Sequence, residues 1–341
     1  MKKILSLAIV FTLMSGIAFA GVVKKTKAEV SFQEFGKFTT EQEIKITSDK
    51  KLTASKNKFK GKGVMGSTVG KMFLKSGETG EIINLAEMMI YSLNHKKKEY
   101  EVRPIEKIME DQGEGDVVAT DEVDAEEEGS NNIKIIRSEF KVEETGDKKN
   151  INDFSCRKYL VTWITEWENL ETGQKGTDRL STDVWTTPLT GELQQAQEQE
   201  NDFNKEYMQR LGFDVDELQQ AILGTNWLSI LSSMGKGGMA PQADGSQFSQ
   251  EMNKIEGYPV IIDGKYYAKR EGGEEDEEEE ESDAGDVKGM LGKFAKKAIG
   301  GKKKDDNEPA FTYYVEVEEL NPESVNDSAF QVPSNYKNKG E

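Results

Sequence analysis

Apolar and polar residues alternate with a period of two along most of this chain, which is the pattern of β-strands that bury one face. Residues 28–32 and 44–46 alternate in this way. Since the side chains of a strand point alternately to its two faces, such segments fold with their apolar face against a core. Three further strands are predicted for residues 79–85, 88–93 and 98–102. A polar turn precedes the last of them and places His95 in a solvent-exposed hairpin turn.

A second series of strands begins after residue 132. Residues 133–142 fit a strand that contains a β-bulge. The strand that follows has apolar side chains on both faces. One face carries four large side chains, Tyr159, Val161, Trp163 and Trp167. Leu160 and Ile164 lie on the opposite face, so we expect this strand to be covered on both sides. A turn at 171–173 and a strand at 177–186 continue the series.

The period then changes from two to 3.6, which predicts a helical cap over about residues 202–255. Phe203, Tyr207 and Leu211 are spaced by four, and Gly212 ends the first helix. Two more short helices are predicted before residue 235, the last containing the apolar residues Trp227, Leu228 and Leu231, and a further one at about 248–255.

Strands return at the end of the chain. Residues 258–263 and 265–270 are predicted to form a hairpin with a turn at Gly264, and residues 311–320 are their expected partner. The order of strands, helices and strands predicts a mainly β (α+β) fold. We expect a single domain over residues 21–341.

The first 20 residues have the features of a cleaved export signal. Lys2 and Lys3 precede an apolar stretch at 4–14, and residues 18–20 form a small-residue cleavage site. Gly21 would follow the cut, where a lipoprotein requires Cys. We therefore expect a periplasmic or secreted protein without a lipid anchor. The alternative is an uncut membrane anchor, but the apolar stretch is short for a membrane span.

Two charged segments interrupt the fold. Residues 110–132 are predicted to form an acidic loop, and 272–309 a low-complexity insertion that includes an unbroken run of eight acids at 274–281. Basic and apolar residues follow that run at helical spacing. The candidate membrane contacts are Met290, Leu291, Lys293, Phe294, Lys296 and Lys297. The insertion is interpreted as a solvated loop with attracting halves, as a membrane-surface contact, or as a weak Ca²⁺ buffer.

Composition excludes several kinds of chemistry. The net charge is −18, which argues against nucleic acid as a partner. One His and one Cys make a zinc site, a disulfide framework or a His-based triad improbable. Residues 61–66 match G-x-G-x-x-G, but they lack the apolar strand and helix of a dinucleotide site. We expect no enzyme, no metal and no cofactor.

We expect Cys156 to be a buried thiol, with a reactive thiol beside Arg157 and Lys158 as the alternative.

Five segments carry a family resemblance: residues 256–260, 313–317, 330–337, 82–100 and 151–161. Together they resemble exported bacterial proteins of the LolA-like superfamily, which includes the periplasmic lipoprotein carriers. The resemblance implies a curved antiparallel half-barrel sheet whose concave face is capped by helices, with an apolar cavity between them. Relatives of this fold carry acyl chains or lipid anchors.

Two functions follow as expectations. The first is a non-enzymatic protein that binds a hydrophobic ligand, a lipid or acyl chain, between sheet and cap helices. Its candidate contacts are Phe203, Tyr207, Trp227, Leu228 and Leu231. The second is an envelope scaffold or protein-interaction module whose basic insertion contacts a membrane or a partner. The sequence leaves the oligomeric state open.

Overall fold

The computed structural model describes residues 21–33, 36–63, 76–107, 133–212, 245–271 and 308–340. Twelve strands form within these residues. They are β1 (Val22–Phe32), β2 (Gly36–Ile46), β3 (Lys50–Gly61), β4 (Gly77–Asn84), β5 (Met89–Asn94), β6 (Glu99–Pro104), β7 (Ile133–Ile151), β8 (Phe154–Asn169), β9 (Lys175–Thr187), β10 (Tyr258–Glu271), β11 (Phe311–Pro322) and β12 (Lys337–Asn338).

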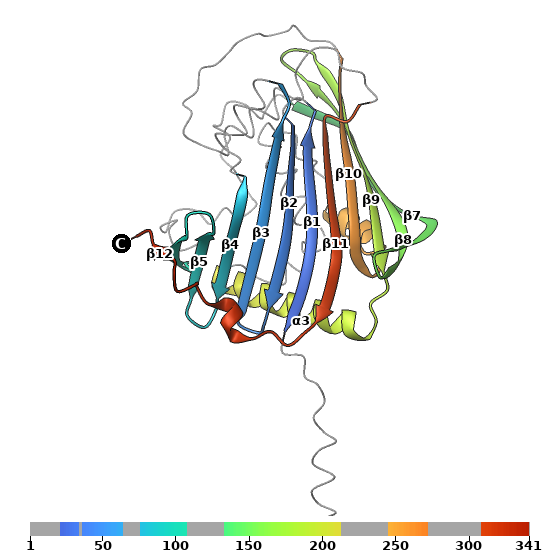
Figure 1. Cartoon of the computed structure of the whole chain (residues 1–341). Helices are drawn as coiled ribbons and strands as arrows, with labels where there is room; N and C mark the ends of the chain where they lie inside the picture. Colours follow the sequence, from blue (N-terminus) through green and yellow to red (C-terminus); the bar gives the residue numbers. More distant parts are fainter. Residues whose placement is uncertain are drawn as a thin grey trace, which may run out of the picture.

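All twelve strands belong to one open, curved sheet, in the spatial order β12-β6-β5-β4-β3-β2-β1-β11-β10-β9-β8-β7 (Figure 1). Neighbouring strands are antiparallel, except that β12 runs parallel to β6. The prediction of a mainly β fold built on a curved antiparallel sheet is confirmed. The first strand lies in the middle of the sheet, because β1 pairs with β2 on one side and with β11 on the other.

The predicted partnership of residues 258–270 with 311–320 is confirmed, but the predicted turn at Gly264 is wrong. Residues on both sides of Gly264 form the single continuous strand β10. A Cβ atom at Gly264 would lie 2.0 Å from ring atoms of Tyr313 on β11. The glycine therefore leaves room for an aromatic ring from the neighbouring strand, and it does not reverse the chain.

The predicted bulge is confirmed, because the pairing of β7 with β8 shifts between Ile135 and Arg137. The prediction that β8 is covered on both faces is not confirmed by the described part of the chain. Its alternate residues from Tyr159 to Trp167 are buried, whereas Leu160 and Ile164 are only half-buried. They are paired with charged residues on β7 and β9, whose aliphatic stems can shield apolar side chains without a second layer.

Helix α3 (Gly191–Arg210) crosses the ends of the central strands behind the sheet as seen in Figure 1, and α6 (Gly245–Met252) lies farther along the sheet. We call the face that both helices contact the inner face. The predicted end of the first helix at Leu211–Gly212 is confirmed, but the helix begins at residue 191, earlier than predicted. Residues 213–244, including Trp227, Leu228 and Leu231, lie outside the described residues.

Phe203 connects α3 to the sheet, since it is 1% exposed and belongs to the cluster that the helix forms with Val22 and Ile46 at the strand ends. A second cluster covers the inner face of β7–β11, where Met252 and Phe248 of α6 pack against side chains such as Trp163. The two helices thus cover different parts of the same face.

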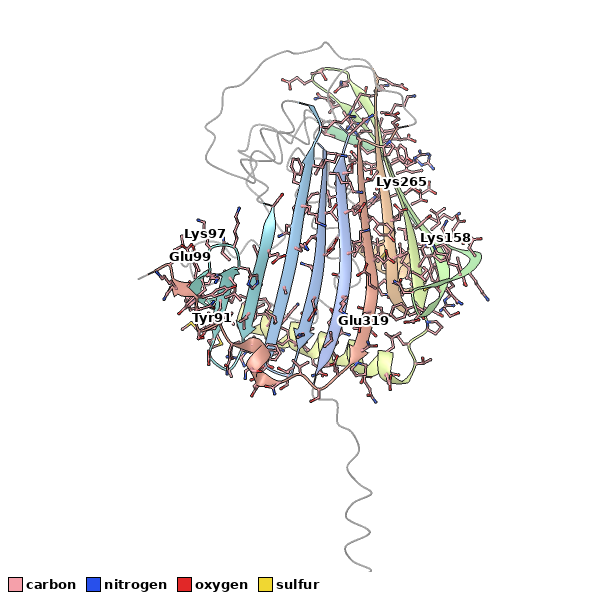
Figure 2. The ribbon with its side chains drawn as sticks, viewed as in Figure 1. Tyr91, Lys97, Glu99, Lys158, Lys265 and Glu319 are labelled. Atoms are coloured by element: carbon pink, nitrogen blue, oxygen red, sulfur yellow. The ribbon has the colours of Figure 1, made fainter. Side chains whose placement is uncertain are left out.

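The outer face carries rows of charged side chains, some of which are labelled in Figure 2. Glu319 on β11 pairs with Lys25 on β1 at 2.5 Å, and Lys158 on β8 pairs with Asp183 on β9 at 2.9 Å. Such pairs hold neighbouring strands in register, but exposed pairs of this kind contribute only about 0–1 kcal/mol each.

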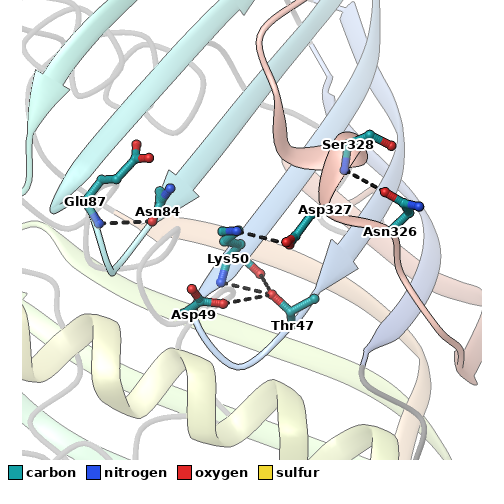
Figure 3. A network of polar contacts seen from close by, with 8 residues as sticks. All are labelled: Thr47, Asp49, Lys50, Asn84, Glu87, Asn326, Asp327 and Ser328. Carbon is teal, nitrogen blue, oxygen red and sulfur yellow. Dashed lines mark hydrogen bonds and ion pairs between the residues drawn. The ribbon is translucent and has the colours of Figure 1, made fainter.

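The chain's last described residues pack on the outer face of β3–β6. The short helix η1 (Asp327–Phe330) places Phe330 against Ile82 and Leu93. Lys50 donates to Asp327 at 3.0 Å, next to the turn in which the backbone N–H of Lys50 donates to Thr47 (Figure 3). After this helix, β12 pairs with the edge strand β6.

Candidate functional site

The inner face has a central part whose side chains are less deeply buried than those under the helices. Four apolar residues form this part, which we call the inner-face strip: Ala28, Val30, Phe38 and Val315. All four are half-buried. They are direct neighbours across strands, because Val30 is opposite Phe38 of β2, and Ala28 is opposite Val315 of β11. The strip is therefore continuous over three strands.

A group of charged and polar side chains lies where α3 meets the sheet. We call it the inner-face cluster: Lys24 on β1, Lys51 on β3, Glu200 and Asn204 on α3, and Tyr258 on β10. Lys24 Nζ is 2.8 Å from Glu200 Oε1, and each of these two side chains is 15% exposed. Tyr258 donates to the other carboxylate oxygen at 3.3 Å. Both oxygens of Glu200 therefore have partners from the sheet.

Lys51 is the second cation of this cluster. Its Nζ donates to Asn204 Oδ1 at 3.5 Å, which is the upper limit for a hydrogen bond, and lies 5.8 Å from the centre of the Phe203 ring. Lys51 takes part in no ion pair within the described residues. The two lysines and one glutamate leave one positive charge in excess.

Burial and charge shift the titration of these groups in different directions. Burial would lower the pKa of Lys24, but the neighbouring Glu200 carboxylate outweighs it and raises that pKa above its usual range. For Lys51 burial prevails, and its pKa lies below the usual value for lysine. Burial, together with the charge of Glu200, raises the pKa of Tyr258 to about 12. Lys24 is thus compensated by its carboxylate, whereas Lys51 bears a desolvation cost.

Sequence reasoning identified Phe203 and Tyr207 but missed this cluster. The buried stripe of α3 continues N-terminally from Phe203 through Glu200 and Ala196 at helical spacing. A carboxylate inside an apolar stripe is a recognisable signal of a buried polar contact. The predicted cap begins at about residue 202, so Glu200 lies just before it and is not among the predicted contacts.

Two of the five sequence-predicted ligand contacts, Phe203 and Tyr207, lie within the described residues. Phe203 and Tyr207 stack on one side of α3, with ring centres 6.5 Å apart. Phe203 is packed in the core and Tyr207 is half-buried beside it. The predicted membrane contacts Met290, Leu291, Lys293, Phe294, Lys296 and Lys297 lie outside the described residues. So do residues 1–20, the acidic loop and nearly all of the charged insertion.

Side chains beyond the cluster form a polar ladder across the inner face. Thr26 donates to Gln42 at 3.4 Å, and Gln42 donates to Ser55 at 3.2 Å. The ladder joins β1, β2 and β3 between the inner-face cluster and the strip. It places hydrogen-bonding groups between the charged cluster and the apolar strip.

A second buried ion pair lies toward the far end of β8–β10. Asp178 accepts from Trp167 Nε1 at 2.9 Å and from Arg270 at 2.8 Å, and Arg270 lies over the Trp167 ring. Both carboxylate oxygens are used, so this arrangement has the features of a structural contact between three strands.

The two other side chains considered for chemistry, Cys156 and His95, are both at least half-buried. Cys156 is 3% exposed, as predicted, and burial raises its pKa to about 11. The turn containing His95 is confirmed, but its predicted exposure is wrong. The ring is half-buried, and its Nδ1 lies 2.7 Å from the Tyr336 hydroxyl of the C-terminal segment. In the described part of the chain, no three His, Cys, Asp or Glu side chains are grouped as a metal site.

None of the helices in the described ranges has the length and apolar character that a membrane crossing requires. Three comparisons, with protein-family models, with curated proteins and with solved structures, found no match to this chain.

Proposed function

We propose that this chain is a non-enzymatic periplasmic or secreted protein that binds a hydrophobic ligand, a lipid or acyl chain, on the inner face of its sheet. The observation that carries the proposal is the inner-face strip, where four apolar side chains on three adjacent strands remain half-buried. Contiguous apolar surface on a concave element is the usual lining of a site for apolar ligands.

Two further features support the proposal. Helix α3 packs across the strand ends on the same face as the strip, which agrees with the cap that the LolA-like resemblance implies. The outer face, by contrast, is occupied by ion pairs and by the C-terminal segment. The inner face therefore suits a ligand better than the outer face does.

The test is uptake of a fluorescent fatty acid, combined with native mass spectrometry of protein purified from the envelope. Ala28→Glu places a charge in the inner-face strip, and Ser31→Glu on the same strand places the same charge on the outer face. We expect a co-purified lipid and uptake by the wild type and by Ser31→Glu, with uptake reduced at least about tenfold in Ala28→Glu, because burying an unpaired charge is costly. No uptake by folded wild-type protein would refute the proposal.

A second candidate, an envelope scaffold or interaction module, is favoured by the exposed apolar side chains at one end of the sheet. Ile136 on the edge strand β7 is 52% exposed and Leu170, after β8, is 61% exposed. Exposed apolar side chains near a sheet edge favour contact with another protein. Cross-linking from a cysteine introduced at Ile136 in the Cys156→Ser background would capture a partner under this proposal.

A further inference from the structure

We propose that Lys51 forms a subsite for the anionic group of an amphiphilic ligand, a carboxylate or a phosphate, whose apolar chain lies along the inner-face strip. This inference rests on the proposed function and adds the chemical class of the ligand to it. It is carried by the position of Lys51 beside α3, on the same face of the sheet as the strip, and by its incomplete set of partners.

The ammonium group of Lys51 has fewer partners than it can bind. An ammonium group has three donors, and Lys51 has one acceptor at 3.5 Å within the described residues. Lys24, only two strands away, has Glu200 at 2.8 Å. A half-buried ammonium with a single long hydrogen bond is poorly compensated for its desolvation, and its lowered pKa agrees with this. An anion at this point would supply the missing acceptors.

The charge of Lys51 is not balanced by Glu200. One carboxylate oxygen of Glu200 contacts Lys24 and the other accepts from Tyr258, so both oxygens already have partners. The inner-face cluster keeps one positive charge in excess, at Lys51, since Glu81 on β4, the other carboxylate that acts on Lys51, pairs with Arg103 at 4.0 Å. A carboxylate or phosphate would balance that charge, and hydrogen bonds between charged groups are the stronger ones in proteins.

Lys51 and the strip lie on the same face of the sheet. Lys51 is opposite Ile46 on β2, and Ile44, two residues nearer to the strip, is half-buried. Ala28 and Val30 lie farther along the same face of β1. Lys51 and Val22 are both opposite Ile46, so the level of Lys51 is about 20 Å from that of Ala28, the nearest strip residue on β1, at the rise of a β-strand. An extended apolar chain of about that length, held at Lys51 by its anionic group, can therefore reach the strip.

The experiment compares three ligands with the same chain: oleate, oleyl phosphate and oleyl alcohol. The variant Lys51→Met keeps the aliphatic length of the side chain and removes its charge. The control Lys45→Met removes a lysine from the outer face of β2, where it pairs with Glu43 at 2.9 Å. Affinities are measured by displacement of a fluorescent fatty alcohol from the full chain.

We expect the wild type and Lys45→Met to bind at least one of the two anions about tenfold or more tightly than the alcohol, the size of one charged hydrogen bond. In Lys51→Met the anions and the alcohol should bind equally, with the affinity for the alcohol unchanged. A preference for oleate alone indicates a carboxylate ligand, and a preference for oleyl phosphate alone indicates a phosphate ligand.

Thermal unfolding shows whether the Lys51→Met variant is folded. Lys51→Met should unfold at the same temperature as the wild type or higher, because a poorly compensated buried charge is removed. Anion preference retained in Lys51→Met, or absent in the wild type while the alcohol binds, would overturn the subsite alone. Failure of all three ligands to bind would overturn the proposed function as well.

Discussion

At the scale of single residues, Cys156 illustrates how placement in the sheet decides chemistry. Its sequence neighbours Arg157 and Lys158 could favour a thiolate, but Arg157 points to the opposite face of β8 and Lys158 pairs with Asp183 at 2.9 Å. Cys156 packs with Ile151, Val260 and Ile261. Burial outweighs the attraction of the nearby Lys149 and raises the thiol pKa to about 11.

We therefore predict that Cys156 is inert in the folded protein. At pH 8 a pKa raised from 9.0 to about 11 lowers the thiolate fraction about a hundredfold, and burial slows access further. Reaction with a disulfide reagent should be at least that much slower in native buffer than in guanidinium chloride, where the chain's single thiol reacts fully. Comparable rates in the two conditions would contradict the prediction.

At the scale of elements, β10 shows that a glycine can serve a neighbouring strand. The ring of Tyr313 lies across Gly264, and its hydroxyl is 2.8 Å from Thr182 on β9. Three strands are joined at this point by one tyrosine. A side chain at residue 264 would have to displace that ring, so the glycine is required by packing.

Gly264→Ala should lower the free energy of unfolding by about 1–3 kcal/mol, because the added methyl overpacks the contact. In the Tyr313→Leu background the same substitution should have a clearly smaller effect, since the ring is gone. Urea denaturation of the wild type, both single variants and the double variant gives the coupling between the two positions. An equal effect in both backgrounds would show that the ring is not the cause.

At the scale of the whole molecule, the C-terminal segment from η1 to β12 covers the outer face of β3–β6. Phe330 is 7% exposed and packs on Ile82 and Leu93. Lys50 anchors η1 through Asp327, and β12 then pairs with β6, the edge strand of the sheet. The segment thus covers apolar side chains that the inner-face helices cannot reach, and it protects a strand edge.

Phe330→Ala should destabilise the fold by about 3 kcal/mol, the usual order for removing a buried aromatic side chain. The neighbouring exposed residue provides the control, because Gln331→Ala should change the unfolding midpoint by less than about 0.5 kcal/mol. Chemical denaturation and binding of a dye for exposed apolar surface are the measurements. A stable Phe330→Ala variant that binds no dye would show that the segment is dispensable.

Several features were predictable from the residues because they depend on local pattern. The helix end at Leu211–Gly212, the bulge in β7 and the burial of Cys156 all follow from spacing and residue type. The inner-face cluster was not predictable, because its members come from α3 and from β1, β3 and β10. Lys24 and Lys51 are unremarkable in their own strands, and only pairing brings them to Glu200 and Asn204.

The sequence by itself determined most of the strand segments, though not β3, and where the main helix ends, since periodicity and glycine act through neighbouring residues. Only the tertiary structure decided that Gly264 lies inside a strand, that β1 lies beside β11, and that Lys51 has a single acceptor in the described part of the chain. These outcomes depend on register and packing between residues far apart in the chain, and no local pattern carries that information.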